Sequence, residues 1–347
     1  MYFKKILFYV SLVGLIIFSY FAYFVYNVML APNTNFSNEE AFIFISLNDD
    51  YQDVRRQLKP LLKDIETFDV LAKRKQYSKY FRTGKYRIVR GMTNNDIINS
   101  IRSNNVPVKL SFNNQNTIEE LAGRIAFQID VDSMSLLAVM NDVAFLNKNG
   151  FTKATCLGMY LPNSYEVFWN TDPEQFRNRM LKEYNRFWNT NRIEKARSLG
   201  MSQNEVITLA SIVYEESKKV SEQPKIAGVY INRLKNNWPL QADPTLKFAA
   251  YQLPRYKNKV IKRILNVHKE IESPYNTYRN RGLPPGLIAM PDLSAIDAVL
   301  NYEKHSYFYF AANAEKIGFH KFARTLREHN QNARNYQDYL SEQGIRH

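Results

Sequence analysis

Glu216 is the residue of this sequence with the clearest potential for chemistry, because it falls on the apolar side of a predicted helix. In the stretch that begins at Ser202, Leu209 and Val213 recur at helical spacing, and the same spacing continues to Glu216. At about 100° per residue, Glu216 lies near the middle of the apolar stripe, whereas Glu215 points away from it. A buried carboxylate is costly unless it is paired, hydrogen-bonded or protonated. Burial raises the pKa of a carboxyl group, and a raised pKa suits a general acid at neutral pH.

Two loop-rich segments downstream of this helix carry polar side chains that are candidates to bind a ligand. They span residues 238–245 and 273–291, and their prolines and glycines fix the backbone. Rigid loops that bear amide, hydroxyl, carboxyl and phenol groups are suited to hold a polar molecule. The candidate substrate-binding residues are Gln241, Asp243, Thr245, Tyr275, Asn276 and Tyr278. Asp243 precedes a proline, so ordinary turn formation explains it equally well.

The sequence offers little for other kinds of catalysis. Cys156 is the single cysteine, which allows no internal disulfide and no zinc cluster, and the five histidines include no HExxH pair. No G-x-S-x-G, Walker or Rossmann glycine pattern occurs. We therefore expect no metal and no cofactor, and we expect His320 and His329 to be structural residues near the site.

The N-terminus predicts a membrane anchor. Lys4 and Lys5 precede an uncharged run over residues 6–30 that is rich in Leu, Ile, Val and Phe and long enough to cross a bilayer. Lysines before the run place residues 1–5 in the cytoplasm, so the rest of the chain is expected on the periplasmic (extracytoplasmic) side of the cell (inner) membrane. A cleaved signal peptide is the alternative, but the run exceeds the usual apolar core of such a peptide.

The chain is basic, with a formal net charge of +14 over 347 residues. Inside a cell this charge would favour nucleic-acid binding, but the predicted membrane segment argues against a nucleic-acid partner. Outside the membrane, the available acidic partners are lipid head groups and the carboxylates of cell-wall polymers. A solvated basic surface without a partner is the alternative interpretation for any one Lys or Arg.

The elements that must position these residues predict an α+β fold in two parts behind the membrane helix. Residues 39–115 form a small α+β unit with strands at 41–47, 84–89 and 106–112 and helices at 54–62, 65–71 and 93–101. Residues 116–347 form a larger, mixed α/β unit, with helices at about 134–147, 173–199, 203–219 and 224–236 and a strand at 306–312. A Ser202-x-x-Glu205 capping box begins the helix that carries Glu216.

Five motifs occur in the order found in the endolytic murein transglycosylases of the MltG (YceG-like) type, and the sequence resembles that family over most of its length. The motifs read LASIVYEE, INRL, LQADPT, YNTY and GLPPGLIA and begin at residues 209, 231, 240, 275 and 282. The region of Gly84 resembles part of a LysM-like module, which would make residues 39–115 that module and 116–347 the YceG-like catalytic domain. Each motif is short, but five in order at similar spacing make coincidence improbable.

This resemblance implies a specific reaction. Family members cleave the β-1,4 bond between N-acetylmuramic acid and N-acetylglucosamine in nascent peptidoglycan strands without water. The cut leaves 1,6-anhydromuramic ends and terminates glycan elongation. The family's catalytic glutamate, the last residue of its LASIxxxE stretch, corresponds to Glu216, which would act first as general acid and then as general base. Members often carry another Glu two residues earlier, where this chain has Tyr214, so the role of a second carboxylate is open.

The resemblance also implies partners. Peptidoglycan glycan strands would be the substrate, the membrane would hold the single-pass anchor, and peptidoglycan synthases would act nearby.

Three other interpretations of the sequence remain open. A non-catalytic, anchored wall-binding scaffold would use the LysM-like module for sugar contact. Glu216 would alternatively be a structural buried carboxylate paired with Arg233 or another cation. A hydrolytic muramidase would need a second carboxylate to hold water, and the sequence supplies Glu215, Glu222, Asp243 and Glu272.

Overall fold

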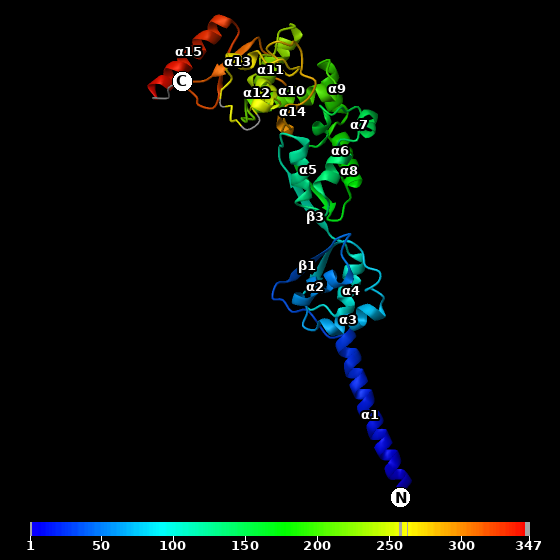
Figure 1. Cartoon of the computed structure of the whole chain (residues 1–347). Helices are drawn as coiled ribbons and strands as arrows, with labels where there is room; N and C mark the ends of the chain where they lie inside the picture. The colour runs from blue at the N-terminus through cyan, green and yellow to red at the C-terminus, as the bar shows by residue number, and fades with distance from the viewer. Residues whose placement is uncertain (1, 257–258, 262, 344–347) are drawn as a thin grey trace. The chain divides into compact units, whose positions relative to one another are not determined.

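The computed structural model describes residues 2–256, 259–261 and 263–343, which form two compact units (Figure 1). Unit 1 contains the residues up to Leu110 together with Ala126–Val131 and Ser164–Asp172. Unit 2 contains Ser111–Ile125, Asp132–Asn163 and the residues from Pro173 onward. Helices and strands are both present, in agreement with the α+β class expected from the sequence.

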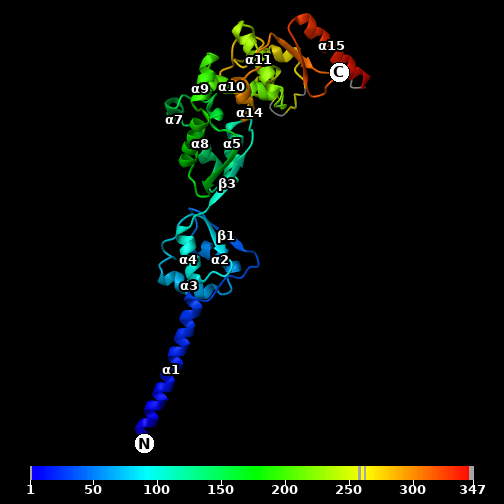
Figure 2. The ribbon, with the colours of Figure 1, turned by 180° about the vertical axis from the view of Figure 1, so that it is seen from behind.

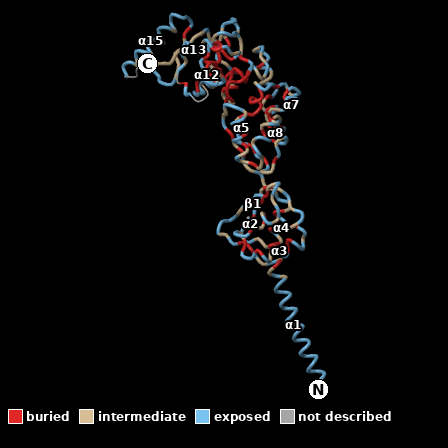
Figure 3. Tube along the Cα trace, in the orientation of Figure 1, coloured by how far each residue is buried: buried red, intermediate tan, exposed pale blue. Residues whose placement is uncertain are grey.

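Helix α1 (Tyr2–Met29) is an apolar helix of 28 residues with a hydropathy of 2.1. At 1.5 Å per residue it extends roughly 40 Å, which exceeds the ~30 Å hydrocarbon core of a bilayer. Its side chains are exposed along nearly the whole length, as the pale blue tube in Figure 3 shows. A helix of this length and composition is compatible with a single crossing of a membrane.

The last turn of α1 is part of the core of unit 1. Val28 is buried there, and its carbonyl accepts a hydrogen bond from Asn94 Nδ2 at 3.1 Å. Asn94 is fully buried at the start of α4 (Asn94–Ser103), and Asn33 Nδ2 donates to its Oδ1 at 2.7 Å. In both views of the ribbon the end of α1 meets α3 (Ile65–Arg74) (Figures 1 and 2). The apolar helix therefore continues into the fold without a flexible linker.

The core of unit 1 lies between a two-stranded antiparallel sheet and its helices. Strand β1 (Glu40–Ile45) pairs with β2 (Gly84–Val89), with Ile43 opposite Tyr86. Alternate residues of each strand are buried, because successive side chains of a strand point to opposite faces. Helix α2 (Tyr51–Leu58), the turn η1 (Lys59–Leu61), α3 and α4 supply the other side of the core. The LysM-like character of this unit stays a prediction.

The chain between α4 and the helix that carries Glu216 forms two strands and several helices. Strand β3 (Pro107–Phe112) pairs with β4 (Asn163–Phe168), and both strands pass from one unit to the other. The other elements between β3 and α10 along the chain are α5 (Ile118–Ala126), α6 (Ser133–Met140), α7 (Val143–Lys148), η2 (Cys156–Met159), α8 (Pro173–Phe187) and α9 (Thr190–Ser198).

Helix α10 (Gln203–Glu216) lies at the centre of unit 2. It packs against α11 (Gln223–Lys235), α12 (Asp243–Tyr251) and α14 (Leu293–Leu300), and Figure 3 shows buried backbone gathered in this region. The remaining elements are η3 (Pro254–Tyr256), α13 (Asn266–Lys269), the antiparallel pair β5 (Tyr309–Ala312) and β6 (His320–Ala323), and α15 (Leu326–Glu342).

Several element boundaries differ from the sequence predictions because short polar side chains interrupt helices. The helix expected over 173–199 is two helices, since Asn189 Oδ1 accepts from the backbone N–H of Arg192 at 3.0 Å and starts α9. The helix expected over 134–147 is likewise divided, with Asp142 capping α7. The helix expected to reach residue 219 ends at Glu216, and the strand expected from 306 begins at Tyr309.

Candidate active site

Glu216 is the last residue of α10 and lies at the end of its apolar face. Leu209 and Val213 on that face are fully buried, whereas Glu216 is half-buried and keeps contact with solvent. Glu215 is exposed and forms a salt bridge with Lys218 at 2.7 Å. The helix thus turns Glu216 inward and Glu215 outward, as the spacing predicts. The carboxyl group lies at the edge of the core, not sealed within it.

The chain turns sharply after Glu216, which keeps the end of α10 in place. Ser217 has an extended backbone, and its carbonyl accepts a hydrogen bond from Gln223 Nε2 at 3.0 Å. The Ser217 hydroxyl donates to Glu222 Oε2 at 3.2 Å. Ser217, Glu222 and Gln223 are all buried, so these bonds are shielded from water. The first residues of α11 therefore hold the carboxyl-bearing end of α10.

The Tyr230 hydroxyl on α11 donates a hydrogen bond to Glu216 Oε1 at 2.6 Å. Tyr230 is buried, and its ring makes an edge contact with Phe310 at 5.9 Å between ring centroids. Burial and the neighbouring Glu216 charge raise the pKa of Tyr230 well above 10, so this hydroxyl remains a donor. Tyr230 was not among the residues predicted from the sequence.

The pKa of Glu216 is raised from an ordinary 4.5 to about 7, and burial is the main cause. The Tyr230 hydrogen bond opposes this rise because it stabilises the carboxylate, and the negative charge of Asp243 adds to it. His320 and Arg233 act against the rise through their positive charge. The result is a carboxyl group that exchanges its proton near neutral pH, which is the property required of a general acid and base.

Arg233 does not pair with Glu216 directly. Its Nε donates to the carbonyl of Phe308 at 2.8 Å, and its Nη1 donates to the carbonyl of Leu240 at 2.6 Å. Among the described residues no cation forms a salt bridge with Glu216. The interpretation of Glu216 as half of a structural ion pair with Arg233 is therefore wrong. Arg233 instead joins the loop before α12 to the segment before β5.

Asp243 and Tyr278 come from the two predicted loops and meet at the site. The Tyr278 hydroxyl donates to Asp243 Oδ1 at 2.6 Å, and Tyr278 is half-buried while Asp243 is exposed. Asp243 is the first residue of α12, where a carboxylate suits the positive end of the helix. The Asp243 charge acts on Glu216, and the Glu216 charge acts on Tyr278, so both residues lie within electrostatic range of Glu216. The structure thus joins Asp243 to Tyr278 directly and brings this pair near Glu216.

Three other predicted residues use their polar groups within the protein. The Thr245 hydroxyl donates to the Ala242 carbonyl at 2.7 Å, and Thr245 is fully buried. Asn276 is also fully buried and donates to the carbonyls of Lys269 at 2.9 Å and Ile271 at 2.8 Å. Tyr275 is buried against Phe248, with 4.6 Å between ring centroids. These side chains hold the loops in place, and their contact with a substrate stays a prediction.

Gln241 is exposed and has a left-handed backbone, with φ of 48°. This conformation is uncommon for residues other than glycine, and the Gln241 N–H is fixed by a 3.0 Å bond to the Thr277 carbonyl. Gln241 lines a cavity of about 570 Å³ with Trp238, Arg281 and Tyr309. Tyr309, which lines this cavity, has its ring 5.5 Å from the Arg233 guanidinium, and the charge of Arg233 acts on Glu216.

Buried Glu222 and half-buried His320 form a second hydrogen-bonded pair. Glu222 Oε2 is 2.8 Å from His320 Nδ1, and the His320 backbone N–H donates to Glu222 Oε1 at 2.6 Å. Hydrogen bonding to His320 lowers the pKa of Glu222 despite the desolvation that acts the other way. His320 thus has Glu222 as a structural partner, and its charge also acts on Glu216. The importance of Glu222 was not evident from the sequence.

These features place one carboxyl group with a raised pKa at the solvent-accessible end of a buried helix, on a mixed helix and strand fold. The model of the YceG-like family matches residues 43–335, and the chain belongs to that family. The sequence is 31% identical over 278 residues to an endolytic murein transglycosylase of Bacillus subtilis, with 74% of this chain and 73% of the relative covered. It is 25% identical over 303 residues to an endolytic murein transglycosylase of Streptococcus pneumoniae, covering 78% of this chain but only 53% of that relative.

A crystal structure of a YceG-like protein from Listeria monocytogenes has a similar fold. The TM-score is 0.56 at 26% sequence identity, and the match covers 85% of this chain and 99% of the other. The family expected from the five motifs is thereby confirmed.

Proposed function

We propose that this protein is a membrane-anchored endolytic murein transglycosylase that cuts peptidoglycan glycan strands. The relatives that carry this name support the class of reaction. The observation that carries the proposal is Glu216, a half-buried carboxyl group with a pKa of about 7 at the solvent-accessible end of an apolar helix face. Such a group holds a proton at neutral pH and is able to release it to a substrate.

In the proposed reaction Glu216 acts twice. Protonated Glu216 donates its proton to the glycosidic oxygen as the bond between that oxygen and C1 of N-acetylmuramic acid breaks. The resulting carboxylate then accepts the proton of the C6 hydroxyl while O6 forms a bond to C1 and closes the 1,6-anhydro ring. Glu216 ends protonated, so no water is consumed. Attack within one sugar has a large effective-molarity advantage, which removes the need to hold a separate nucleophile.

The surrounding residues support both steps. Tyr230 donates to Glu216 Oε1 and stabilises the carboxylate that forms after the first step. Asp243 supplies a negative charge near the position where the oxocarbenium-like charge develops, and Tyr278 holds Asp243 by its 2.6 Å hydrogen bond. The cavity lined by Trp238 and Arg281 would bind a neighbouring part of the strand, with the Trp238 ring against a sugar face.

A hydrolytic muramidase is the second candidate function. It needs a second carboxylate as the base that activates water, and Asp243 is better placed for this role than Glu215 or Glu222. Glu215 is paired with Lys218, and Glu222 is bonded to His320. Asp243 contributes to the raised pKa of Glu216 and is exposed to solvent, so of these three carboxylates it is the one able to activate a water molecule near the acid.

Analysis of the product ends separates these functions. Full-length protein in detergent is incubated with purified glycan strands, and the new ends are identified by mass spectrometry. Anhydromuramic ends support the lytic reaction, reducing ends support the hydrolase, and the lack of new ends supports a non-catalytic scaffold. Glu216→Gln should abolish cleavage, whereas the matched variant Glu215→Gln should retain most of it. Cleavage by Glu216→Gln at the wild-type rate would refute the assignment.

We also propose that α1 anchors the protein in the cell membrane with both units outside, beside nascent strands and the peptidoglycan synthases that make them. The length and hydropathy of α1 and the lysines at its start support this orientation. Protease added to intact protoplasts should degrade both units, and full protection from the protease would contradict this topology.

A further inference from the structure

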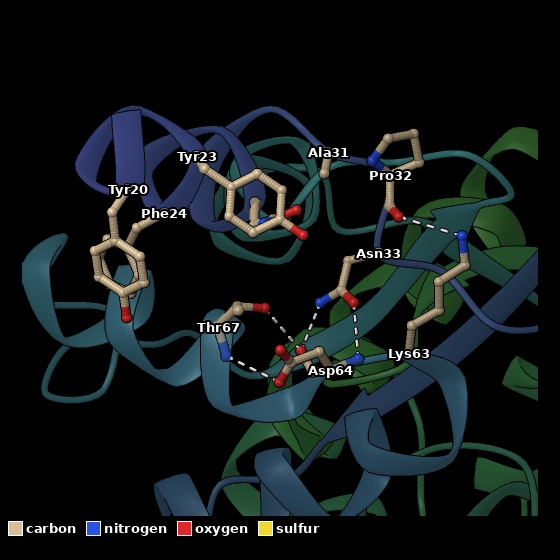
Figure 4. Close-up of a pocket in the computed structure, with 10 residues that line it drawn as sticks. Tyr20, Tyr23, Phe24, Ala31, Pro32, Asn33, Lys63, Asp64 and Thr67 are labelled. Atoms are coloured by element: carbon tan, nitrogen blue, oxygen red, sulfur yellow. Dashed lines mark hydrogen bonds between the residues drawn. The ribbon is translucent and has the colours of Figure 1, made fainter. Parts of the chain in front are cut away.

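A cavity of about 380 Å³ lies within unit 1 where α1 meets the folded part of the unit. Its wall on the α1 side is aromatic and includes Tyr20, Tyr23 and Phe24. Its opposite wall is polar and includes Lys63, which precedes α3, and Thr67 in the first turn of α3. Figure 4 shows the rings of Tyr20 and Phe24 at one end and Lys63 at the other. The cavity is therefore amphipathic along its length.

The position of the cavity along α1 places it at the membrane surface, given that α1 crosses the bilayer. Tyr20 lies about 15 Å before Leu30 at 1.5 Å per residue, so its ring reaches the depth of the upper acyl chains. Tyrosines of membrane helices gather at this depth, where the ring is in an apolar region and the hydroxyl is hydrated. Lys63 follows the exit of α1 and lies at the level of the head groups.

Lys63 is a cation without a carboxylate partner among the described residues. Its Nζ makes one long contact, 3.4 Å to the Pro32 carbonyl. A second cavity, of about 430 Å³, lies on the other side of Pro32 and is lined by Lys63 and Arg90. Arg90 donates to the Ser37 carbonyl at 3.0 Å and, within the described ranges, also forms no salt bridge. Two cations that form no salt bridge with any described residue thus lie beside the point where the chain leaves the membrane.

Asp64 also lines the cavity, and one oxygen of its carboxylate caps α3. Asp64 Oδ1 caps α3 by accepting from the backbone N–H groups of Glu66 at 2.9 Å and Thr67 at 3.2 Å. Its charge is offset by the positive end of that helix. Lys63 and Asp64 are the two charged side chains that line the cavity, and the Lys63 ammonium is the one that attracts an anion.

We propose that this cavity binds one anionic phospholipid of the outer leaflet. The lipid phosphate lies at Lys63, and its glycerol and upper acyl region lie against Tyr20, Tyr23 and Phe24. Because the last turn of α1 is part of the unit 1 core, such a lipid would fix the unit at the membrane surface. The proposal rests on the proposed membrane anchoring by α1.

Lipid retention by the full-length protein tests this proposal. The protein is reconstituted into nanodiscs that contain equal amounts of phosphatidylglycerol and phosphatidylcholine, and the lipids that remain bound after release are identified by native mass spectrometry. Wild type should retain one phosphatidylglycerol with a preference of about fivefold, the effect of one lysine beside an anionic lipid. Lys63→Gln should lose the preference. Lys73→Gln, an exposed change at the other end of α3, is the matched control and should keep it.

The other outcomes are equally decisive. An equal preference in Lys63→Gln and wild type, or no preference in wild type, would overturn the proposal. Displacement of the lipid by excess inorganic phosphate would also overturn it, because the site would then take free phosphate and not a lipid. Tyr23→Leu keeps α1 apolar and should weaken retention, and circular dichroism shows whether each variant is folded. Failure of the anchor is seen separately, since the protein would then not co-purify with nanodiscs.

Discussion

The Tyr230 hydroxyl donates to Oε1 of Glu216 over 2.6 Å, and this bond joins the end of α10 to the middle of α11. The hydroxyl stays protonated because burial and the nearby carboxylate raise its pKa. In the described part of the chain, Oε2 of Glu216 has no hydrogen-bond partner. One oxygen of the carboxyl group is thus fixed, and the other is left for the proton transfer that we propose.

Tyr230→Phe should move the alkaline limb of the pH–rate profile upward by about one pH unit. Loss of a hydrogen bond to the charged form destabilises the carboxylate and so raises the pKa of Glu216, and such a bond contributes roughly 1.5 kcal/mol or more. The measurement is kcat/KM on glycan strands between pH 5 and 9. Tyr160→Phe is the matched control, because the buried Tyr160 hydroxyl has no partner among the described residues. An unchanged limb in Tyr230→Phe would show that the bond does not act on the catalytic acid.

Asp243→Asn should move the same limb in the opposite direction. The negative charge of Asp243 contributes to the raised pKa of Glu216, so its removal lowers that pKa and reduces the protonated fraction at neutral pH. The rate at pH 7 should fall several-fold while the end products stay the same, which product analysis by mass spectrometry checks. A switch from reducing ends in wild type to no product in Asp243→Asn would instead identify Asp243 as the base of a hydrolase.

Glu216→Gln should stabilise the protein at alkaline pH relative to wild type. The folded-state pKa of Glu216, about 7, is above its ordinary 4.5, so the folded state prefers the protonated form. Its stabilising contribution is complete below pH 4.5 and is lost as the pH rises toward 7. The two proteins should therefore be similar in stability at pH 4, with the variant more stable by about 3 kcal/mol at pH 8. Urea unfolding at both pH values measures this, and a constant difference would contradict the raised pKa.

The sequence was sufficient to find Glu216, since helical periodicity determines which side of α10 faces the core. It was also sufficient to find the apolar helix α1, whose composition alone predicts it. Tyr230 was missed because a tyrosine in an apolar helix is usually core, and its partner is on another helix. Glu222 and His320 are 98 positions apart, and no local pattern predicts that they meet.

The loop residues show a second limit of what the sequence alone could predict. The residue types of 238–245 and 273–291 predicted polar loops, but they did not predict which side chains face the solvent. Thr245 and Asn276 turned inward because buried carbonyls in these loops need donors, whereas Asp243 remained exposed. Gly286 was expected to be part of the loop scaffold, and a Cβ atom there would lie 2.0 Å from the Ala154 carbonyl oxygen. Such a close approach between distant segments is visible only in the fold.

Trp238→Ala should raise KM for glycan strands by roughly tenfold with little change in kcat, because the ring lines the cavity beside the site and does not touch Glu216. Trp238 is partly exposed and is supported by Phe308 at 5.0 Å between ring centroids, so an aromatic surface is presented to the cavity. Trp238→Phe keeps that surface and should retain most of the affinity. An equal loss of kcat and kcat/KM in Trp238→Ala would place the ring in the chemical step instead.

Arg281→Gln should weaken binding of strands that carry stem peptides more than binding of strands from which the peptides have been removed. Arg281 is exposed, lines the same cavity as Trp238, and has no carboxylate partner among the described residues, so its charge is available to the carboxylates of a stem peptide. KM is measured for both kinds of strand, and roughly a tenfold increase is expected for the peptide-bearing strands alone. Arg279→Gln is the matched control, because Arg279 is already 3.7 Å from Glu270 and does not line the cavity. An equal increase for both kinds of strand would mean that Arg281 contacts the sugar chain, not the peptide.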